Sequence, residues 1–472
     1  MTITLEHKTI FEKLRSGVIG IDQQVPLLDG GRTTYAYLDN AASTPALGHV
    51  QRKVNQALRW YSSVHRGSGY KSLISTRAYE QARAMVASFF GADLDSDVVI
   101  FGKNTSEAVN QLANAMAFGP EDVVLTTTME HHSDDLPWRA KARVEHVGIQ
   151  PDGSLDLDDL KSRLERNDGK VRLVAVTGAS NVTGYLPPLH DIAVLAHEHG
   201  ATIFVDCAQL AAHRKIHMGP VGSPRRLDFI AISAHKMYAP FGTGALIGPK
   251  AFFEKAPPDY RGGGTIEVVT LDEVHWAGAP ERGEVGSPNV LGAIALAASI
   301  QELERVGMDA IAEHEAELTS YALEKLNAMP EITLYGSTDP QRIEDRIGVI
   351  SFRVAGIPHA KVAAILGFEG GIGVRNGCFC AHPYVNQLLN VGQEEFERFR
   401  DEALQGNRSR TPGMVRMSFG CYNTREEVDR VLVMLERMIN RETIGEYEID
   451  LPSGAYYPRG FQWEEMQKVF EE

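Results

Sequence analysis

RLVAVT (172–177), TIFV (202–205) and DFIAIS (228–233) are three short runs rich in β-branched and apolar residues. Between the first two runs, Ile192–His199 has helical periodicity and ends at Gly200, a residue type that commonly stops helices. Strand and helix alternating at this spacing are typical of a parallel sheet with helices on both faces. The middle of the chain is therefore predicted to have an α/β fold.

Polar residues follow the ends of these runs, and parallel α/β sheets concentrate their chemistry at that edge. Asn181, Asp206 and Ser233 all lie at or just past the end of a predicted strand. Lys236 comes shortly after Ser233, where its amine can form a Schiff base with a carbonyl compound. Asp206 precedes Lys236 by 30 residues, about one βα unit, so we expect both to border one cleft. The alternatives are a solvent-exposed lysine and an aspartate that caps a helix.

The segment GKNTSE (102–107) precedes a helical run at 108–117. A helix N-terminus that carries the Thr105 and Ser106 hydroxyls offers several hydrogen-bond donors to a phosphate group. The alternative is a capping box, because a threonine or serine followed by an acidic residue also caps helices.

Glu130, His131 and His132 follow another short apolar run, at 123–125. An imidazole at this place could lie over a flat ring at the edge of the sheet. A metal site is the alternative, because two aspartates follow the two histidines. Adjacent residues rarely point at one ion, however, and no second histidine cluster has the spacing of a zinc site.

Four cysteines in 472 residues are too few for a disulfide framework; they are Cys207, Cys378, Cys380 and Cys421. Cys378 and Cys380 lie in a predicted glycine-containing loop near Arg375, whose positive charge would favour a thiolate. A cysteine can also serve as a small buried apolar residue. Two thiols alone do not complete a tetrahedral metal site.

The chain after residue 290 is predicted to form a smaller α+β region, with helices at 291–306 and 311–329 and a closing helix at 426–441. Strand-like runs occur at 348–354 and 414–419, and Arg416 lies within the second. An inward-pointing arginine there needs a carboxylate. Its planar fork suits the α-carboxylate of a substrate, and an internal salt bridge is the alternative.

We expect four segments: an N-terminal arm joining the small domain (1–35), a large domain (36–290), a small domain (291–443) and a C-terminal extension (444–472). Tyrosines and a tryptophan in the extension argue against disorder, so we expect it to pack on the body or on a partner subunit.

Composition narrows the possible partners. The formal net charge of −15 makes the chain a poor candidate for binding the phosphate backbone of nucleic acids. The longest apolar stretch, 291–300, is half of the roughly 20 residues needed to span a bilayer. No signal peptide is apparent, so we expect a cytoplasmic protein without a membrane anchor.

Taken together, these motifs resemble a known family. The chain is similar to the fold-type I pyridoxal-phosphate enzymes of the class V aminotransferase group, and most similar to their group II cysteine desulfurases and selenocysteine lyases. The resemblance extends from about residue 37 to about residue 435. It rests on YLDNAASTP, VHRG, NTSE, MEHH, SNVTG, VDCAQ, SAHK, RGGG, GSPN, VRNGCFCAHP and VRMSFGCYNT, in the order of the family.

The resemblance implies a fold, a cofactor and an activity. The fold is α/β, with a mainly parallel seven-stranded sheet in a large domain and a small α+β C-terminal domain. The cofactor is pyridoxal 5'-phosphate. The activity is the conversion of L-cysteine to L-alanine, with the sulfur left as a persulfide on Cys380. A C–S lyase, an epimerase or another class V enzyme acting on a cysteine-derived compound is the alternative.

Roles for individual residues follow from the same resemblance. Lys236 would form the Schiff base, Cys380 would be the nucleophile and His131 would stack on the cofactor ring. The remaining cofactor-binding residues would be Thr105, Ser106, Asn181, Asp206, Gln209, Ser233, His235 and Ser287. Asn181, Arg416 and Arg375 would bind the substrate carboxylate.

The resemblance also implies partners. Ser287 matches a residue that reaches the cofactor phosphate from a second subunit, so a homodimer is expected, together with a protein that accepts the sulfur. No metal is expected. The sequence departs from the family at Phe379, where a histidine is frequent before the catalytic cysteine, and at Cys378. Cys378 could relay or protect sulfur, or simply be packed.

Overall fold

The structure is a computed structural model that describes residues 5–462. Parts of two predicted segments, residues 1–4 of the N-terminal arm and 463–472 of the C-terminal extension, lie outside the described residues. The predicted domain boundaries stay a prediction. Among the described residues, no helix combines the length and the apolar character needed to cross a membrane.

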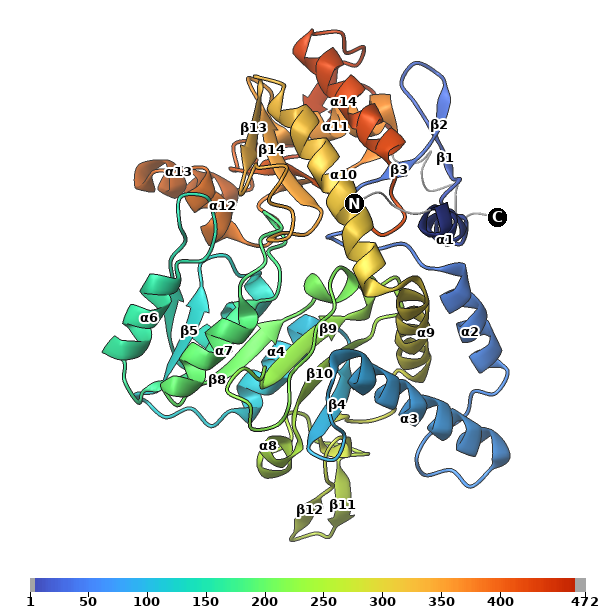
Figure 1. The fold of residues 1–472 in the computed structure, drawn as a ribbon, viewed down its shortest axis with the longest axis vertical. Helices are drawn as coiled ribbons and strands as arrows, with labels where there is room; N and C mark the ends of the chain where they lie inside the picture. Colours follow the sequence, from blue (N-terminus) through green and yellow to red (C-terminus); the bar gives the residue numbers. More distant parts are fainter. Residues whose placement is uncertain (1–4, 463–472) are drawn as a thin grey trace.

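A sheet of seven strands forms the centre of the lower half of the molecule in Figure 1. In spatial order the strands are β4 (Asp97–Gly102), β10 (Gly244–Pro249), β9 (Phe229–Ser233), β8 (Thr202–Asp206), β7 (Val171–Thr177), β5 (Val123–Thr127) and β6 (Arg143–Val147). Only β10 runs antiparallel to its neighbours. The predicted α/β fold with a mainly parallel sheet is therefore confirmed.

Helices cover both faces of this sheet because successive strand residues point to opposite sides. On β8, Ile203 and Val205 belong to one apolar core, whereas Phe204 between them belongs to another. The first core lies under α3 (Tyr70–Phe90), α6 (Leu157–Arg166), α7 (Leu189–Glu198) and α9 (Val290–Val306). The second lies under α4 (Thr105–Ala115), α5 (Leu136–Arg139) and α8 (Lys250–Lys255).

A second, antiparallel sheet forms the upper part of the molecule (Figure 1). Its strands are, in order, β13 (Ile332–Tyr335), β14 (Val349–Val354), β17 (Met414–Ser418) and β16 (Arg375–Gly377). Its core is shared with α10 (Met308–Asn327), α11 (His359–Gly370) and α14 (Arg425–Ile439). Because α10 begins in the core of the large sheet and ends in this one, it connects the two parts of the molecule.

The remaining elements are short or peripheral. The helices are α1 (Leu5–Ser16), α2 (Gly48–Leu58), α12 (His382–Leu388), α13 (Gln393–Leu404) and the 3-10 turns η1 (His132–Asp134), η2 (Leu210–Ala212), η3 (Ala234–Lys236) and η4 (Glu281–Gly283). The strand pairs are β1 (Gln24–Pro26) with β2 (Arg32–Thr34), β3 (Ala36–Tyr37) with β15 (Ile372–Gly373), β11 (Ile266–Val269) with β12 (Val274–Trp276), and β18 (Tyr447–Ile449) with β19 (Tyr456–Pro458).

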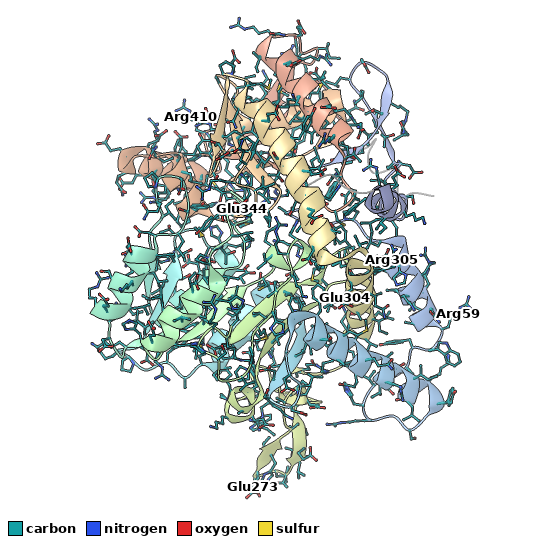
Figure 2. All side chains as sticks on the ribbon, in the orientation of Figure 1. Arg59, Glu273, Glu304, Arg305, Glu344 and Arg410 are labelled. Atoms are coloured by element: carbon teal, nitrogen blue, oxygen red, sulfur yellow. The ribbon has the colours of Figure 1, made fainter. Side chains whose placement is uncertain are left out.

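Charged side chains cover the outside of this architecture. Figure 2 shows the labelled Arg59, Glu273 and Arg410 at the outer edge of the molecule, Glu273 beside the projecting β11–β12 hairpin. The hairpin β18–β19 packs on α11, where the Tyr447 hydroxyl donates a 3.0 Å hydrogen bond to Glu369. This part of the C-terminal extension is thus packed on the body of the same chain.

Several predicted helices begin one to three residues later than the observed ones, and two differences between prediction and structure bear on the site. Helix α4 begins at Thr105 rather than at residue 108, because the Asn104 side chain accepts a hydrogen bond from the Glu107 N–H and caps the helix earlier. The segment predicted as a loop from Arg375 begins as strand β16, which pairs with β17 through Arg375–Arg416, and only then turns. Cys378 and Cys380 follow at the end of that strand.

Candidate active site

The carboxyl ends of the parallel strands and the loop after β16 enclose a cavity of about 260 Å³. It collects nearly all of the residues predicted from the sequence: Thr105, Ser106, His131, Asn181, Asp206, Gln209, Ser233, His235, Lys236, Arg375, Cys380 and Arg416. Ser287 is the exception; it is exposed in the loop before α9 and is not part of the cavity lining. Its predicted role in a partner's site stays a prediction.

Lys236 and Asp206 come from neighbouring strands, as their spacing predicts. Asp206 is the last residue of β8 and is buried, and its Oδ1 accepts a 2.9 Å hydrogen bond from the Ala208 N–H. Lys236 Nζ donates to Gln209 Oε1 at 3.3 Å. Burial lowers the pKa of Lys236 to about 8 although the charge of Asp206 acts against it. A fraction of the amine is therefore neutral and nucleophilic near physiological pH.

His131 presents a neutral ring to the cavity. Burial, assisted by the charge of Lys236, lowers the pKa of His131 to about 3. Its Nδ1 accepts a 3.1 Å hydrogen bond from the Ser133 N–H, so the ring proton resides on Nε2. An uncharged imidazole held in one orientation can lie against the face of a flat ring.

One end of the cavity offers donors to a phosphate group. The Thr105 N–H and hydroxyl both contact Ser233 Oγ at 2.9 Å, and Ser106 Oγ lies 2.5 Å from Ser133 Oγ. Asn104, not Thr105 or Ser106, caps the helix, so the predicted capping-box alternative is wrong and those hydroxyls face the cavity. Burial lowers the pKa of His235 to about 4, leaving a neutral ring.

Gly244 makes this arrangement possible. A Cβ at Gly244 would lie 2.5 Å from the Ile232 carbonyl oxygen and 2.6 Å from Asn104 Cα. Only glycine therefore lets β10 pass directly beneath the N-terminus of α4.

Arg416 also lines the cavity and is only 2% exposed. Its guanidinium donates to the Asn181 carbonyl oxygen and to Asp39 Oδ1, each at 2.9 Å. The internal salt bridge considered from the sequence is thus present, with a carboxylate that the sequence reasoning missed. Asp39 lies within YLDNAASTP, one of the motifs that carry the family resemblance, and that motif could have identified it. Burial raises the pKa of Asp39, whereas the charge of Arg416 opposes that shift.

Phe379 lies against the same guanidinium, with the centre of its ring 4.8 Å from the Arg416 Cζ. This is within the range of a cation–π contact. Phe379 was identified from the sequence only as a departure from the family, and the structure makes it part of the cavity wall.

The loop that carries Cys380 has an uncommon backbone conformation. Phe379 and Cys380 have φ angles of 52° and 56°, in the left-handed region that residues with a Cβ rarely adopt. Two hydrogen bonds, each 2.7 Å long, hold this turn: Asn181 Nδ2 donates to the Phe379 carbonyl and the His132 N–H donates to the Cys380 carbonyl. The loop is thereby held with the exposed Cys380 at the cavity.

Cys378 occupies a different environment from Cys380. Its thiol is buried and donates a 2.9 Å hydrogen bond to the Pro412 carbonyl oxygen. Burial raises the pKa of Cys378 to about 12. The thiolate that a positive neighbour was expected to favour is therefore disfavoured at Cys378, because burial of the sulfur and the charge of Cys380 both raise its pKa.

His131 and His132 do not point at one place. The His132 ring packs edge-on against His382, with ring centres 4.7 Å apart, whereas His131 lines the cavity. Among residues 5–462, no three histidine, cysteine or acidic side chains are arranged as ligands of one ion.

The donor set fits pyridoxal 5'-phosphate. Hydroxyls and a helix N-terminus lie at one end for a phosphate, and Asp206 lies at the sheet edge for a ring nitrogen. Lys236 contributes an amine of lowered pKa to the same cavity, and His131 offers a ring face. The residues of the cavity thus match each chemical group of that cofactor.

Comparisons with known proteins agree with this chemistry. Residues 36–431 match the model of the aminotransferase class-V family. A probable cysteine desulfurase of Halalkalibacterium halodurans is 34% identical over 88% of this chain and 97% of its own length. A cysteine desulfurase of Escherichia coli O139:H28 is 35% identical over 85% of this chain and 93% of its own length.

Solved structures give the same result. The apo structure of a cysteine desulfurase from Thermococcus onnurineus NA1 superimposes with a TM-score of 0.78 at 32% identity, covering 91% of this chain and 98% of that one. A cysteine desulfurase of Escherichia coli, in a form with an S-sulfonic acid, gives a TM-score of 0.74 at 26% identity over 92% of this chain and 99% of that one.

Proposed function

The chain belongs to the aminotransferase class-V family, and from this membership and the chemistry of the cavity we propose that it is a pyridoxal-phosphate-dependent cysteine desulfurase. The reaction converts L-cysteine to L-alanine and leaves the sulfur on the enzyme. The family resemblance inferred from the sequence is thereby confirmed.

One observation carries the proposal. An exposed thiol, Cys380, borders the same cavity as an amine of lowered pKa and a buried carboxylate. The amine can transfer protons and the thiolate can accept sulfur. A transaminase or epimerase needs the amine but has no use for a thiol held in this way.

The cofactor would be held by residues that the cavity brings together. Thr105, Ser106, Ser233 and His235 would bind its phosphate, Asp206 its ring nitrogen, Gln209 its ring hydroxyl and His131 its ring face. Asn181 lies beside them and would contact both cofactor and substrate. When bound, the cofactor supplies an electron sink that makes the substrate Cα–H acidic.

Lys236 would move the proton at the substrate Cα. The pKa of its amine, lowered to about 8, is close to neutral pH, which suits a group that must both accept and release a proton. Burial raises the pKa of Asp206, but the Ala208 N–H and the charge of Lys236 favour its ionised form, which would stabilise a protonated ring nitrogen.

Cys380 would take the sulfur. Its thiolate attacks the substrate sulfur, and a new S–S bond forms as the Cβ–S bond of the substrate breaks. The electron pair of the broken bond stays with the substrate, whose carbon then gains a proton to become the methyl group of alanine. The persulfide remains on Cys380 until an acceptor removes it.

Arg416, with Arg375 and Asn181, would bind the substrate carboxylate. Arg375 is largely exposed at the cavity rim, and Arg416 is buried beneath it. Arg375 Nη1 lies 4.0 Å from Asp39 Oδ2, and Arg416 Nη2 lies 2.9 Å from Asp39 Oδ1. The Asp39 carboxylate therefore limits the net positive charge that the two arginines offer to a substrate.

We also propose a homodimer, a sulfur-acceptor protein and a cytoplasmic location. Ser287 is exposed outside its own cavity, in agreement with a role in a second copy of the chain. The exposed Cys380 could pass sulfur to an acceptor without rearrangement of the core. All four cysteines are unpaired, as in the reducing cytoplasm.

The test is to incubate the purified full-length protein with L-cysteine and to quantify alanine, persulfide, pyruvate and ammonia. Alanine and enzyme persulfide in equal initial amounts support the proposal. Pyruvate and ammonia without alanine would instead establish a C–S lyase. A Lys236→Ala protein that still absorbs in the visible range would show that another lysine forms the Schiff base.

A further inference from the structure

Helix α12 follows directly after the loop that carries Cys380, in the part of the chain that also forms the small sheet. Its first turn nevertheless packs in the core of the large sheet: Ala381 at its start, Tyr384 and Val385 are each 0% exposed and belong to that core. In Figure 1, α12 lies where the two halves of the molecule meet. Tyr384 is the largest of these buried side chains, and no role has been given to it above.

The Tyr384 hydroxyl makes two hydrogen bonds to the large-sheet half of the molecule. It donates its proton to the Gly153 carbonyl oxygen at 2.5 Å. Thr183 Oγ1 lies 2.9 Å from Tyr384 Oη, and Thr183 has to be the donor of that bond, because a phenol carries only one proton. Burial raises the pKa of Tyr384, so the hydroxyl keeps its proton at neutral pH.

The turn that carries Gly153 fits closely against α12. Gly153 has a φ angle of 83°, and a Cβ at this position would lie 3.0 Å from Tyr384 Oη and 3.1 Å from Leu388 Cδ2. Glycine therefore lets the turn approach α12 closely enough for its carbonyl oxygen to accept the hydrogen bond from Tyr384.

The same short segment of the large-sheet half holds the chain on both sides of Cys380. Asn181 donates to the carbonyl oxygen of Phe379, the residue before Cys380. Thr183, two residues along that segment, donates to Tyr384, four residues after Cys380.

Main-chain hydrogen bonds connect Cys380 to Tyr384. The Ala381 N–H donates a 2.9 Å hydrogen bond to the Cys378 carbonyl oxygen, and the Val385 N–H donates a 3.0 Å hydrogen bond to the Ala381 carbonyl oxygen. The loop and the first turn of α12 thus form one hydrogen-bonded unit. A displacement of Tyr384 is therefore transmitted to Cys380.

We propose that Tyr384 is a positioning residue for Cys380, acting through Thr183 and Gly153. The left-handed backbone at Phe379 and Cys380 is unfavourable by itself and persists only where its surroundings restrain it. Asn181 provides the restraint before Cys380, and Tyr384 provides the one after it. The inference rests on the proposed function only for the role of Cys380 as the nucleophile.

Hydrogen exchange of the purified full-length protein, followed by mass spectrometry, tests the restraint without the reaction. Tyr384→Phe keeps the ring but removes both hydrogen bonds of the hydroxyl. We expect the amides of residues 378–388 to exchange at least about fivefold faster than in wild type, because local opening becomes easier. Exchange in β8 should be unchanged.

Tyr447→Phe is the matched control for the loss of a phenol hydroxyl. It removes the 3.0 Å hydrogen bond to Glu369 of α11, a residue outside the cavity lining. Exchange of residues 378–388 should be the same in this variant as in wild type.

Two reactions of the Cys380 thiol separate positioning from general access. Persulfide formation from L-cysteine needs an oriented thiol, so its single-turnover rate should fall about tenfold or more in Tyr384→Phe. Alkylation of Cys380 by iodoacetamide needs only an exposed thiolate, so its rate should stay within about twofold of wild type.

Substitutions of Thr183 test the same contact from its other side. Thr183→Val removes the donor and should change exchange and persulfide formation in the same direction as Tyr384→Phe, whereas Thr183→Ser keeps the hydroxyl and should stay close to wild type. The double variant Thr183→Val with Tyr384→Phe should behave like Tyr384→Phe alone, because both substitutions break one shared contact.

The outcomes separate this inference from the proposed function. Faster exchange of residues 378–388 in Tyr384→Phe, in a protein that forms neither alanine nor persulfide, would support the restraint and contradict the desulfurase. Unchanged exchange in Tyr384→Phe, or an equal increase in Tyr447→Phe, would overturn the inference even if alanine forms. A persulfide rate in Tyr384→Phe equal to that of wild type would overturn the positioning of the nucleophile.

Discussion

The backbone N–H of His132 donates a 2.7 Å hydrogen bond to the carbonyl oxygen of Cys380. His132 comes from the loop after β5 of the large sheet, whereas Cys380 follows β16 of the small sheet. Because this hydrogen bond joins main-chain groups, it fixes the position of the loop at the cavity whatever side chains the two residues carry. The position of the thiol is thus set jointly by the two parts of the molecule.

The second bond of this loop can be removed by substitution. Asn181→Ala deletes the 2.7 Å hydrogen bond to the Phe379 carbonyl and frees the strained turn. We expect the single-turnover rate of persulfide formation to fall about tenfold or more, because misplacement of a nucleophile costs that much or more. Because Asn181 is also proposed to contact the cofactor and the substrate carboxylate, visible absorbance and the KM for L-cysteine are measured in parallel, which separates the loss of those contacts from the effect on the loop. A variant that forms persulfide at the wild-type rate would show that this bond does not position Cys380.

Phe379 should affect substrate binding through Arg416. Phe379→Leu removes the ring that lies 4.8 Å from the guanidinium and opens that side of Arg416 to water. A lost cation–π contact of about 1 kcal/mol predicts a KM for L-cysteine raised about fivefold, with a smaller change in kcat. Phe379→Tyr keeps the ring and is the control, expected to stay close to wild type. Equal KM values for the two variants would contradict this role.

Glu315 is expected to determine stability rather than chemistry. This buried residue of α10 accepts hydrogen bonds from His213 at 2.6 Å and Arg214 at 2.5 Å, both beside the large sheet. Burial alone would raise the pKa of Glu315, but the His213 and Arg214 charges lower it to about 2. Glu315→Gln leaves those partners uncompensated and should lower the free energy of unfolding by about 3 kcal/mol at neutral pH.

The sign of the pH dependence follows from the lowered pKa. The stabilisation is present above the pKa of the unfolded chain and is lost as pH falls towards about 2. The difference between wild type and Glu315→Gln in denaturant unfolding should therefore shrink on acidification. Glu317→Gln on the same helix is the control, because its partner Arg425 lies 3.9 Å away at the surface; it should cost less than about 1 kcal/mol. A constant difference at all pH values would contradict the ionic interaction.

Much of the cavity could be predicted because its chemistry follows local sequence. Asp206 and Ser233 end strands whose β-branched runs are recognisable, and parallel strands bring such ends to one edge. Lys236 follows directly in η3. The seven-stranded sheet, by contrast, was implied only by the family resemblance, because its order depends on pairing between distant strands.

The contacts that could not be predicted join residues that lie far apart in the sequence or depend on the local turn of the backbone. Asp39 and Arg416 form their salt bridge across almost the whole chain, and no periodicity links them. Cys378 and Cys380 have opposite environments although they are two residues apart, because the left-handed turn at Phe379 separates their side chains.

The most direct test of the central claim compares Cys380→Ala with Cys378→Ala after incubation with L-cysteine. Alanine is quantified, and the peptide containing residues 378 and 380 is analysed by mass spectrometry for one added sulfur atom. We expect wild type and Cys378→Ala to form alanine and to carry the persulfide on Cys380, and Cys380→Ala to do neither at a measurable rate. Persulfide and alanine formation that survive in Cys380→Ala but disappear in Cys378→Ala would contradict the account.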